Sequence, residues 1–219
     1  MKEAHTTPRL GQPGLCRQTF RDGETVLLTV KADWPQLEGE SIGAKRISRY
    51  CDALARHWQK RWEGPLLKAA KAAAGPDTPP WSAGMDFKVT LLREDLFSFY
   101  LDIWEDVGLS RPRRLRLGET WRLPEGVPLT LKEVLTPGRR WRRDLLAEVR
   151  RQIEERLTSG ESLFHADWPR QTAARFSPQR FYCTEAGPCL FYPVDAIAPS
   201  LEGFPTFPLK NEKSTCFFP

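Results

Sequence analysis

The residues that could carry acid–base chemistry form one short cluster, Asp102, Glu105 and Asp106. On a β-strand, Asp102 and Asp106 point to the same side, so their carboxylates share a face. A two-carboxylate glycosidase needs such groups on opposite sides of a sugar, with the substrate between them. Two acids on one strand lack that arrangement, and the pattern favours a structural role.

That structural role follows from the strand pairing that the sequence predicts. A turn over residues 106–112 places Asp102 opposite Arg116 and Trp104 opposite Arg114. The first pair is then a cross-strand ion pair, and the second a cation–π contact.

Other catalytic residue types are sparse. The three histidines are His5, His57 and His165, and none has a metal ligand three or four residues further along. The chain contains no GxSxG, Walker-type or GxGxxG motif. The sequence therefore predicts no enzyme, no metal site and no cofactor.

The cysteines give no metal or disulfide framework. Their number is odd and none has CxxC spacing; they are Cys16, Cys51, Cys183, Cys189 and Cys216. Cys51 lies on the apolar stripe of a predicted helix and is interpreted as a core residue. If residues 185–187 form a loop, Cys183 and Cys189 face each other, and a disulfide and free thiols both stay open.

Length and composition favour a single domain. The 219 residues, 40% of them hydrophobic, are enough for a sizeable core. No linker separates domains, so we expect a flexible tail at 1–20, one domain at 21–210 and a second tail at 211–219. Residues 1–20 lack the apolar core of a signal peptide, and no apolar run is long enough to span a bilayer. Read literally, the chain is soluble and cytoplasmic.

The periodicity of apolar residues predicts an α+β fold. Strands are expected at 24–32, 87–91, 97–103 and 113–123, and a loop up to residue 83. A long helix at 41–74, kinked at Gly64-Pro65, and a second at 136–157 alternate with them. We predict an antiparallel sheet packed against two long helices on one face, with a C-terminal aromatic β-hairpin.

Basic runs at 111–116 and 139–143 support an alternative function. The net charge is +5, and arginines interleaved with aromatic residues can grip phosphates and stack bases. The first run alternates inward leucine with outward arginine, as a half-exposed strand does. Helical pairs are expected between Arg140 and Asp144 and between Arg151 and Glu155. A solvated surface is the preferred interpretation, and nucleic-acid binding the alternative. The tryptophans best placed for partner contacts are predicted to be Trp34, Trp81 and Trp168.

The most specific pattern lies near the C-terminus. Two short aromatic runs flank a turn in FYCTEAGPCLFY at 181–192, where Gly187 can take the positive φ of a three-residue hairpin loop. Upstream stand FSFYLDI at 97–103 and LTLKEVL at 129–135, and IAP follows at 197–199. Together these segments resemble the domain of unknown function at the C-terminus of RsiV anti-sigma factors and in PdaC polysaccharide deacetylases.

The resemblance covers about residues 24–210 and implies an extracytoplasmic, non-catalytic domain. It implies as partner a lysozyme-type muramidase, or peptidoglycan and other cell-wall glycan. The turn at 107–111 lacks the histidine often found in that family, and neither a membrane anchor nor a deacetylase domain is visible. We therefore expect a free-standing binding domain rather than a regulator of transcription.

The partner-binding residues are predicted in the loop at 193–204. Two prolines restrict its backbone, so less entropy is lost on docking. Its acidic side chains suit a cationic partner on an otherwise basic protein. The predicted contact residues are Asp195, Pro199, Ser200, Leu201 and Glu202.

Overall fold

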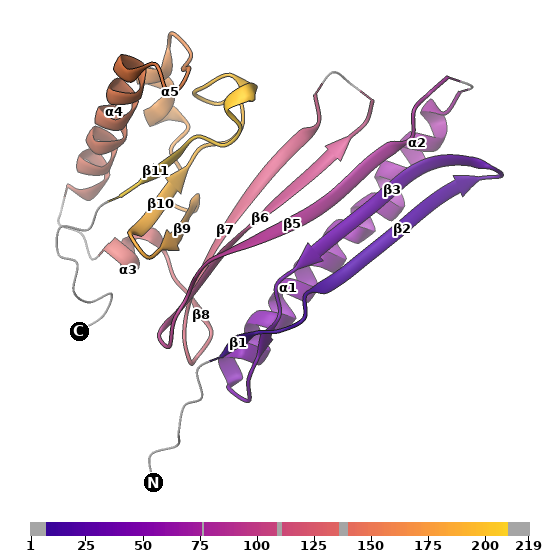
Figure 1. The fold of residues 1–219 in the computed structure, drawn as a ribbon, viewed down its shortest axis with the longest axis horizontal. Coiled ribbons are helices and arrows are strands. Elements are labelled where there is room, and N and C mark those ends of the chain that lie inside the picture. The colour runs from indigo at the N-terminus through magenta and orange to yellow at the C-terminus, as the bar shows by residue number, and fades with distance from the viewer. Residues whose placement is uncertain (1–7, 76, 109–110, 136–139, 210–219) are drawn as a thin grey trace.

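The structure is a computed structural model that describes residues 8–75, 77–108, 111–135 and 140–209. It is an α+β fold built on a six-stranded sheet in the order β2-β3-β5-β6-β7-β8 (Figure 1). These strands are β2 (Gly14–Asp22), β3 (Thr25–Trp34), β5 (Trp81–Leu92), β6 (Leu96–Asp106), β7 (Arg113–Arg122) and β8 (Val127–Pro128). The short strands β1 (Arg9–Leu10) and β4 (Leu37–Glu38) pair separately beside it.

The N-terminal segment is ordered secondary structure where a tail was predicted. Strand β2 is an edge strand that pairs with β3 along its whole length, and β1 pairs with β4, so the predicted tail at 1–20 is wrong for residues 9–10 and 14–20. Only Cys16 and Phe20 of this strand pack against the core, with polar Gln18 between them. Such an edge strand has a weak apolar pattern, which explains why the sequence did not reveal it. The predicted tail at 211–219 lies outside the described residues.

The sheet is mixed rather than antiparallel. Strands β3 and β5 pair in parallel, from Leu28 opposite Trp81 to Ala32 opposite Met85. The helical segment between them carries the chain back to the same end of the sheet, which is the connection that a parallel pair needs. Strand β5 begins at Trp81, before the end of the loop that was predicted up to residue 83.

The long helix predicted over 41–74 consists of three consecutive segments. Helix α1 (Ile42–Arg61) begins at Ser41, whose hydroxyl accepts a hydrogen bond from the Ala44 amide at 3.1 Å. A π-helical turn (Trp62–Leu66) contains Pro65, and α2 (Leu67–Ala73) follows. The wider turn accommodates the proline at the predicted kink. The apolar stripe lies against the sheet, with Ile47 and Cys51 of α1 and Trp62 of the π-helical turn fully buried.

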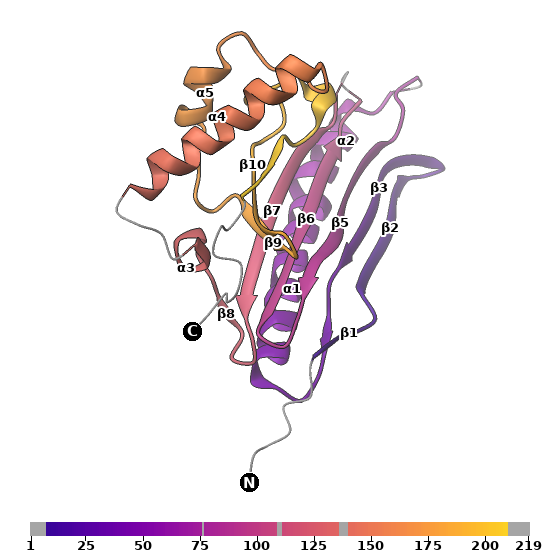
Figure 2. The ribbon, with the colours of Figure 1, turned by 60° about the vertical axis from the view of Figure 1, so that its left-hand side comes forward.

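Helices α3, α4 and α5 lie on the opposite side of the sheet from α1 and α2 (Figures 1 and 2). A second sheet in the order β11-β10-β9 stands there, formed by β9 (Phe181–Thr184), β10 (Gly187–Phe191) and β11 (Thr206–Pro208). It packs with α3 (Leu131–Leu135), α4 (Trp141–Ser159) and α5 (Trp168–Ala174) around a separate apolar cluster. The prediction of helices on one face is therefore wrong, because each apolar cluster has helices of its own. The helix start predicted at Thr136 lies outside the described residues.

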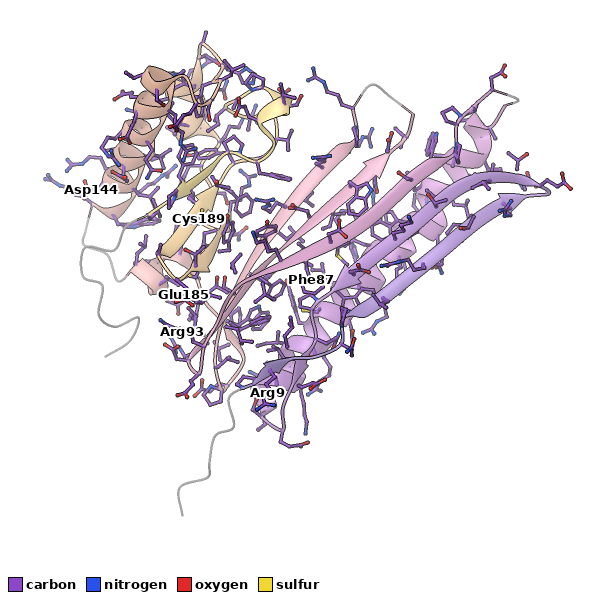
Figure 3. The ribbon with its side chains drawn as sticks, viewed as in Figure 1. Arg9, Phe87, Arg93, Asp144, Glu185 and Cys189 are labelled. Carbon is purple, nitrogen blue, oxygen red and sulfur yellow. The ribbon has the colours of Figure 1, made fainter. Side chains whose placement is uncertain are left out.

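Strands β9 and β10 differ in register from the sequence prediction. Thr184 pairs with Gly187 and Cys183 with Pro188, so two residues connect the strands instead of three. Gly187 has a φ of 121°, positive as expected. Cys183 and Cys189 are free thiols in different apolar clusters, because the one-residue shift turns them to opposite faces. Figure 3 labels Cys189 and Glu185 on this second sheet.

The two sheets meet at a close backbone approach. An added Cβ on Gly118 of β7 would lie 2.0 Å from the Phe181 carbonyl oxygen of β9, so only glycine fits there. Beside it, the buried Ser98 hydroxyl accepts a hydrogen bond from the Cys183 amide at 2.7 Å. Ser98 and Thr120 also share a hydrogen bond at 2.9 Å. These contacts attach β9 to the outer face of the six-stranded sheet, the face turned away from α1.

Candidate ligand-binding cleft

The predicted cross-strand ion pair is present. Asp102 lies opposite Arg116, and the guanidinium donates from Nε and an Nη to the two carboxylate oxygens, both at 2.6 Å. Trp104 lies opposite Arg114, as the predicted turn requires. The strand register and the ion pair are thus confirmed, whereas the Trp104–Arg114 cation–π contact stays a prediction.

Aromatic rings fix the guanidinium of that pair. The Arg116 Cζ atom lies 3.9 Å from the ring centre of Tyr100 and 4.5 Å from that of Phe204. Tyr100 comes from β6, and Phe204 from the loop that leads into β11. A planar cation between two rings gains attraction from both faces and loses rotational freedom. The pair is therefore a rigid part of the outer face.

Trp104 lies across the neighbouring strand. Side chains alternate between the two faces along β6, so Trp104 lies on the outer face with Asp102. Ile103 between them is buried against α1. An added Cβ on Gly84 of β5 would lie 2.3 Å from the Trp104 Cζ2 atom and 2.6 Å from Cη2. The six-membered ring of the indole thus occupies the space above Gly84, where any other residue would place its side chain.

A cleft of about 420 Å³ opens beside this indole. Its walls come from β5, β6, the start of β7 and the loop after β10. The lining residues are Asp86, Asp102, Ile103, Trp104, Pro112, Arg114, Arg116, Gly203 and Phe204. Partial burial raises the pKa of Asp86, and the charges of Asp33 and Asp102 add to the effect. The cleft therefore has the Trp104 ring on one wall and equal numbers of carboxylates and guanidinium groups around it.

The predicted binding loop forms one wall of the cleft. Residues 200–202 make one 3₁₀ turn, and Gly203 and Phe204 reach the lining. Leu201 at the tip is 91% exposed. Glu202 accepts a hydrogen bond from the Leu163 amide at 2.9 Å, and Asp195 lies 3.5 Å from His165 Nε2. The structure thus brings this loop next to the 102–116 strand pair, which the sequence analysis had treated separately.

The tryptophan predictions need correction. Trp34 was predicted to contact a partner, but it is buried and its indole N–H donates to Asp52 at 2.8 Å. Trp168 packs against the second apolar cluster and Trp81 against the first. Trp104, which the sequence analysis placed in a structural pair, is the tryptophan that lines the cleft. Asp86 was missed because its only sequence signal is its alternation with buried neighbours along β5.

The two arginine runs do not form one basic surface. The first lies at the start of β7, and the described part of the second at the start of α4, close to the labelled Asp144 (Figure 3). The two places lie apart in Figures 1 and 2. Arg143 rather than Arg140 contacts the Asp144 carboxylate, at 3.1 Å, while the Arg151–Glu155 pair is present as predicted. Arg139 lies outside the described residues.

The described residues contain neither a metal-binding cluster nor a membrane-spanning helix. No group of histidine, cysteine, aspartate and glutamate side chains in this part of the chain could hold a metal ion. No helix in it is long and apolar enough to cross a membrane.

The fold belongs to a class known from domains of unknown function. The chain has the fold of DUF3298 family proteins, as two solved structures show. One is a DUF3298 family protein from Pseudomonas aeruginosa, with a TM-score of 0.65, 17% identity and coverage of 92% of this chain and 91% of that one. The other comes from Bacteroides fragilis, with a TM-score of 0.62, 14% identity and coverage of 94% and 92%. No protein-family profile and no curated protein matches the sequence.

Proposed function

We propose that the chain is a non-catalytic domain that binds a muramidase-type protein through the loop at 193–204. The observation that carries the proposal is Leu201, an apolar side chain that is 91% exposed at the tip of this loop. A pocket on a partner that covered this side chain would remove its apolar surface from water, which stabilises the complex. The resemblance of the segments at 97–103, 129–135 and 181–199 to RsiV-type domains supports a muramidase as that partner.

Contacts at both ends hold the loop in place. The Glu202 carboxylate bonds to the Leu163 amide, and Asp195 lies beside His165. Asp195 also has a φ of 64°, a conformation uncommon for residues other than glycine. A loop ordered before the partner arrives loses less entropy on docking. The same contacts make Glu202 and Asp195 supports of the loop as well as acidic groups for a cationic partner.

Calorimetry against a panel of muramidases tests the proposal. Leu201→Ser should weaken binding by about tenfold or more, because full burial of a leucine side chain contributes about 1.5–3 kcal/mol. Leu15→Ser is the matched control, since Leu15 is 61% exposed on the edge strand β2. An Asp195→Ala, Glu202→Ala double variant should also bind less well, because both the loop supports and the acidic charges are lost.

Two outcomes would overturn the proposal. One is a wild-type chain that binds no muramidase of the panel. The other is tight binding of RNA or DNA that persists at physiological salt, because phosphate contacts by the arginine runs would then be the main interaction.

A further inference from the structure

We propose that the cleft beside Trp104 is a saccharide-binding site for a neutral oligosaccharide, with an N-acetylated amino sugar as the best-fitting unit. This site goes beyond the muramidase contact at Leu201, and the two can be tested separately. The proposal rests on the platform that Trp104 makes, the polar groups beside it and the charge balance of the cleft.

The platform is built into the sheet. The Trp104 indole lies over Gly84, and its place there depends on the missing side chain of that residue. A tryptophan packed on backbone keeps its position without a ligand, so little side-chain entropy remains to be lost on binding. The ring presents an apolar surface that matches the C–H face of a pyranose. The indole belongs to none of the apolar clusters on either face of the sheet and lines an open cleft instead.

The polar groups are placed for hydroxyl recognition. Asp86 on β5 is exposed next to the indole, and Arg114 on β7 is exposed at the other side. Asp102 keeps a third of its side chain exposed although both oxygens accept from Arg116. Carboxylate and guanidinium groups form the strong charge-assisted hydrogen bonds that orient a polar ligand. A few such groups around an apolar surface are typical of small-ligand sites, and about 300–1,000 Å³ is their usual volume.

The charges select among ligands. Two carboxylates, Asp86 and Asp102, face two guanidinium groups, Arg114 and Arg116, so the lining has no net charge. Asp33 on β3 is a further carboxylate near Asp86, and Arg17 pairs with it, so the charges beside the cleft are balanced as well. A phosphate backbone or a polyuronate would meet these carboxylates at close range, which disfavours nucleic acid and acidic glycans.

The remaining walls are apolar and suit an acetamido group. Phe204 and Pro112 line the cleft beside the arginines. An acetamido substituent carries a methyl group for such a wall, together with an N–H donor and a carbonyl acceptor. The N–H can donate to a carboxylate of the cleft, and the carbonyl can accept from a guanidinium group. A hexose without the acetamido group lacks the methyl contact.

The test uses chitotetraose as the probe and compares it with cellotetraose and an oligogalacturonate. We expect chitotetraose to bind most tightly in calorimetry and the oligogalacturonate least. Trp104→Ala should weaken binding by about tenfold or more, as truncation of a central aromatic contact does. Equal affinity for the anionic oligosaccharide, or no binding of chitotetraose, would overturn the assignment.

Two further measurements keep the test independent of folding. Arg114→Ala should weaken binding, while Arg113→Ala, its exposed neighbour on the opposite side of β7, should leave the affinity unchanged. The indole N–H signal of Trp104 in the NMR spectrum is assigned by its absence from a Trp104→Phe variant. In the wild type this signal should shift when chitotetraose is added. Equal effects of the two arginine changes, or an unmoved Trp104 signal, would contradict the proposal.

The muramidase experiment gives a separate result. Leu201→Ser should leave chitotetraose binding unchanged, and Arg114→Ala should leave muramidase binding unchanged. Failure of one site therefore does not imply failure of the other.

Discussion

Each face of the six-stranded sheet carries an arginine–carboxylate pair with two hydrogen bonds. In one pair the carboxylate is the more buried partner, and in the other pair the arginine is. On the α1 face, Arg61 donates to both oxygens of Glu105 at 2.6 and 2.7 Å. There the carboxylate side chain is 5% exposed and the arginine 41%. On the outer face, the arginine of the Asp102–Arg116 pair is 11% exposed and the carboxylate 34%.

The difference separates a packing role from a binding role. A carboxylate enclosed between helix and sheet can only attach α1 to β6, since a ligand has no access to it. A carboxylate at the mouth of a cleft keeps acceptor capacity for a ligand, while two aromatic rings hold its arginine partner. The same pair of residue types thus stabilises one face and equips the other for recognition.

The largest effect is expected where the second sheet covers the outer face. Gly118→Val should lower the free energy of unfolding by about 3 kcal/mol or more, because overpacking against fixed backbone forces the sheets apart. Denaturant unfolding measures the change. Gly64→Ala is the control, because an added Cβ there meets no atom within 4 Å. A Gly118→Val chain as stable as the wild type would show that the sheets do not approach so closely.

A smaller loss is expected on the α1 face. Arg61→Ala leaves the enclosed Glu105 carboxylate without its partner and should cost about 2 kcal/mol, less than a fully buried pair because water reaches the arginine site. Arg56→Ala, exposed on the same helix, should change stability by less than about 0.5 kcal/mol. If thermal unfolding shows the same loss of stability for Arg61→Ala and Arg56→Ala, the Arg61–Glu105 pair does not stabilise the fold.

The α1 face should also respond to pH through Glu119. Burial raises the pKa of this carboxyl above the ordinary value of 4.5, although the Tyr50 hydroxyl donates to it at 2.5 Å. Between 4.5 and the raised pKa the folded chain binds more protons than the unfolded chain, so this group lowers stability as pH rises through that window.

Glu119→Gln should flatten this part of the stability curve. The amide has no charge to bury and its oxygen can still accept from Tyr50. Glu125→Gln, at an exposed position, serves as the control. Unfolding curves from pH 4 to pH 8 with the same slope for wild type and Glu119→Gln would contradict the prediction.

The smallest effect is expected at the open part of the outer face. Asp86→Asn should change the free energy of unfolding by less than about 0.5 kcal/mol, because the side chain is exposed and its substitute has the same shape. A large loss of stability in chemical denaturation would assign Asp86 to packing. The outer face would then have a packing role, as the Arg61–Glu105 pair has on the α1 face.

Features that depend on neighbours in the sequence were predictable. The spacing of Thr130 and Glu133 is that of a capping box, and the Thr130 amide donates to the Glu133 carboxylate at 2.8 Å. Gly160 follows α4 with a φ of 70°, the left-handed conformation that glycine adopts most easily at the end of a helix. The Asp102–Arg116 pair followed from one short turn, because the register of two adjacent strands depends on the residues that connect them.

The sequence by itself thus determined the α+β class, the helix ends at Thr130 and Gly160, and the ion pair at the edge of the cleft, but not the length of the turn between β9 and β10. Only the tertiary structure decided that β3 and β5 run parallel, that the helices occupy opposite sides, and that Trp104 lies over Gly84 beside the loop at 193–204. Apolar periodicity shows that a side chain is buried but not which distant element buries it. Trp104 and Phe204 are a hundred residues apart along the chain, so their common cleft depends on how the two sheets pack, and no local pattern contains that information.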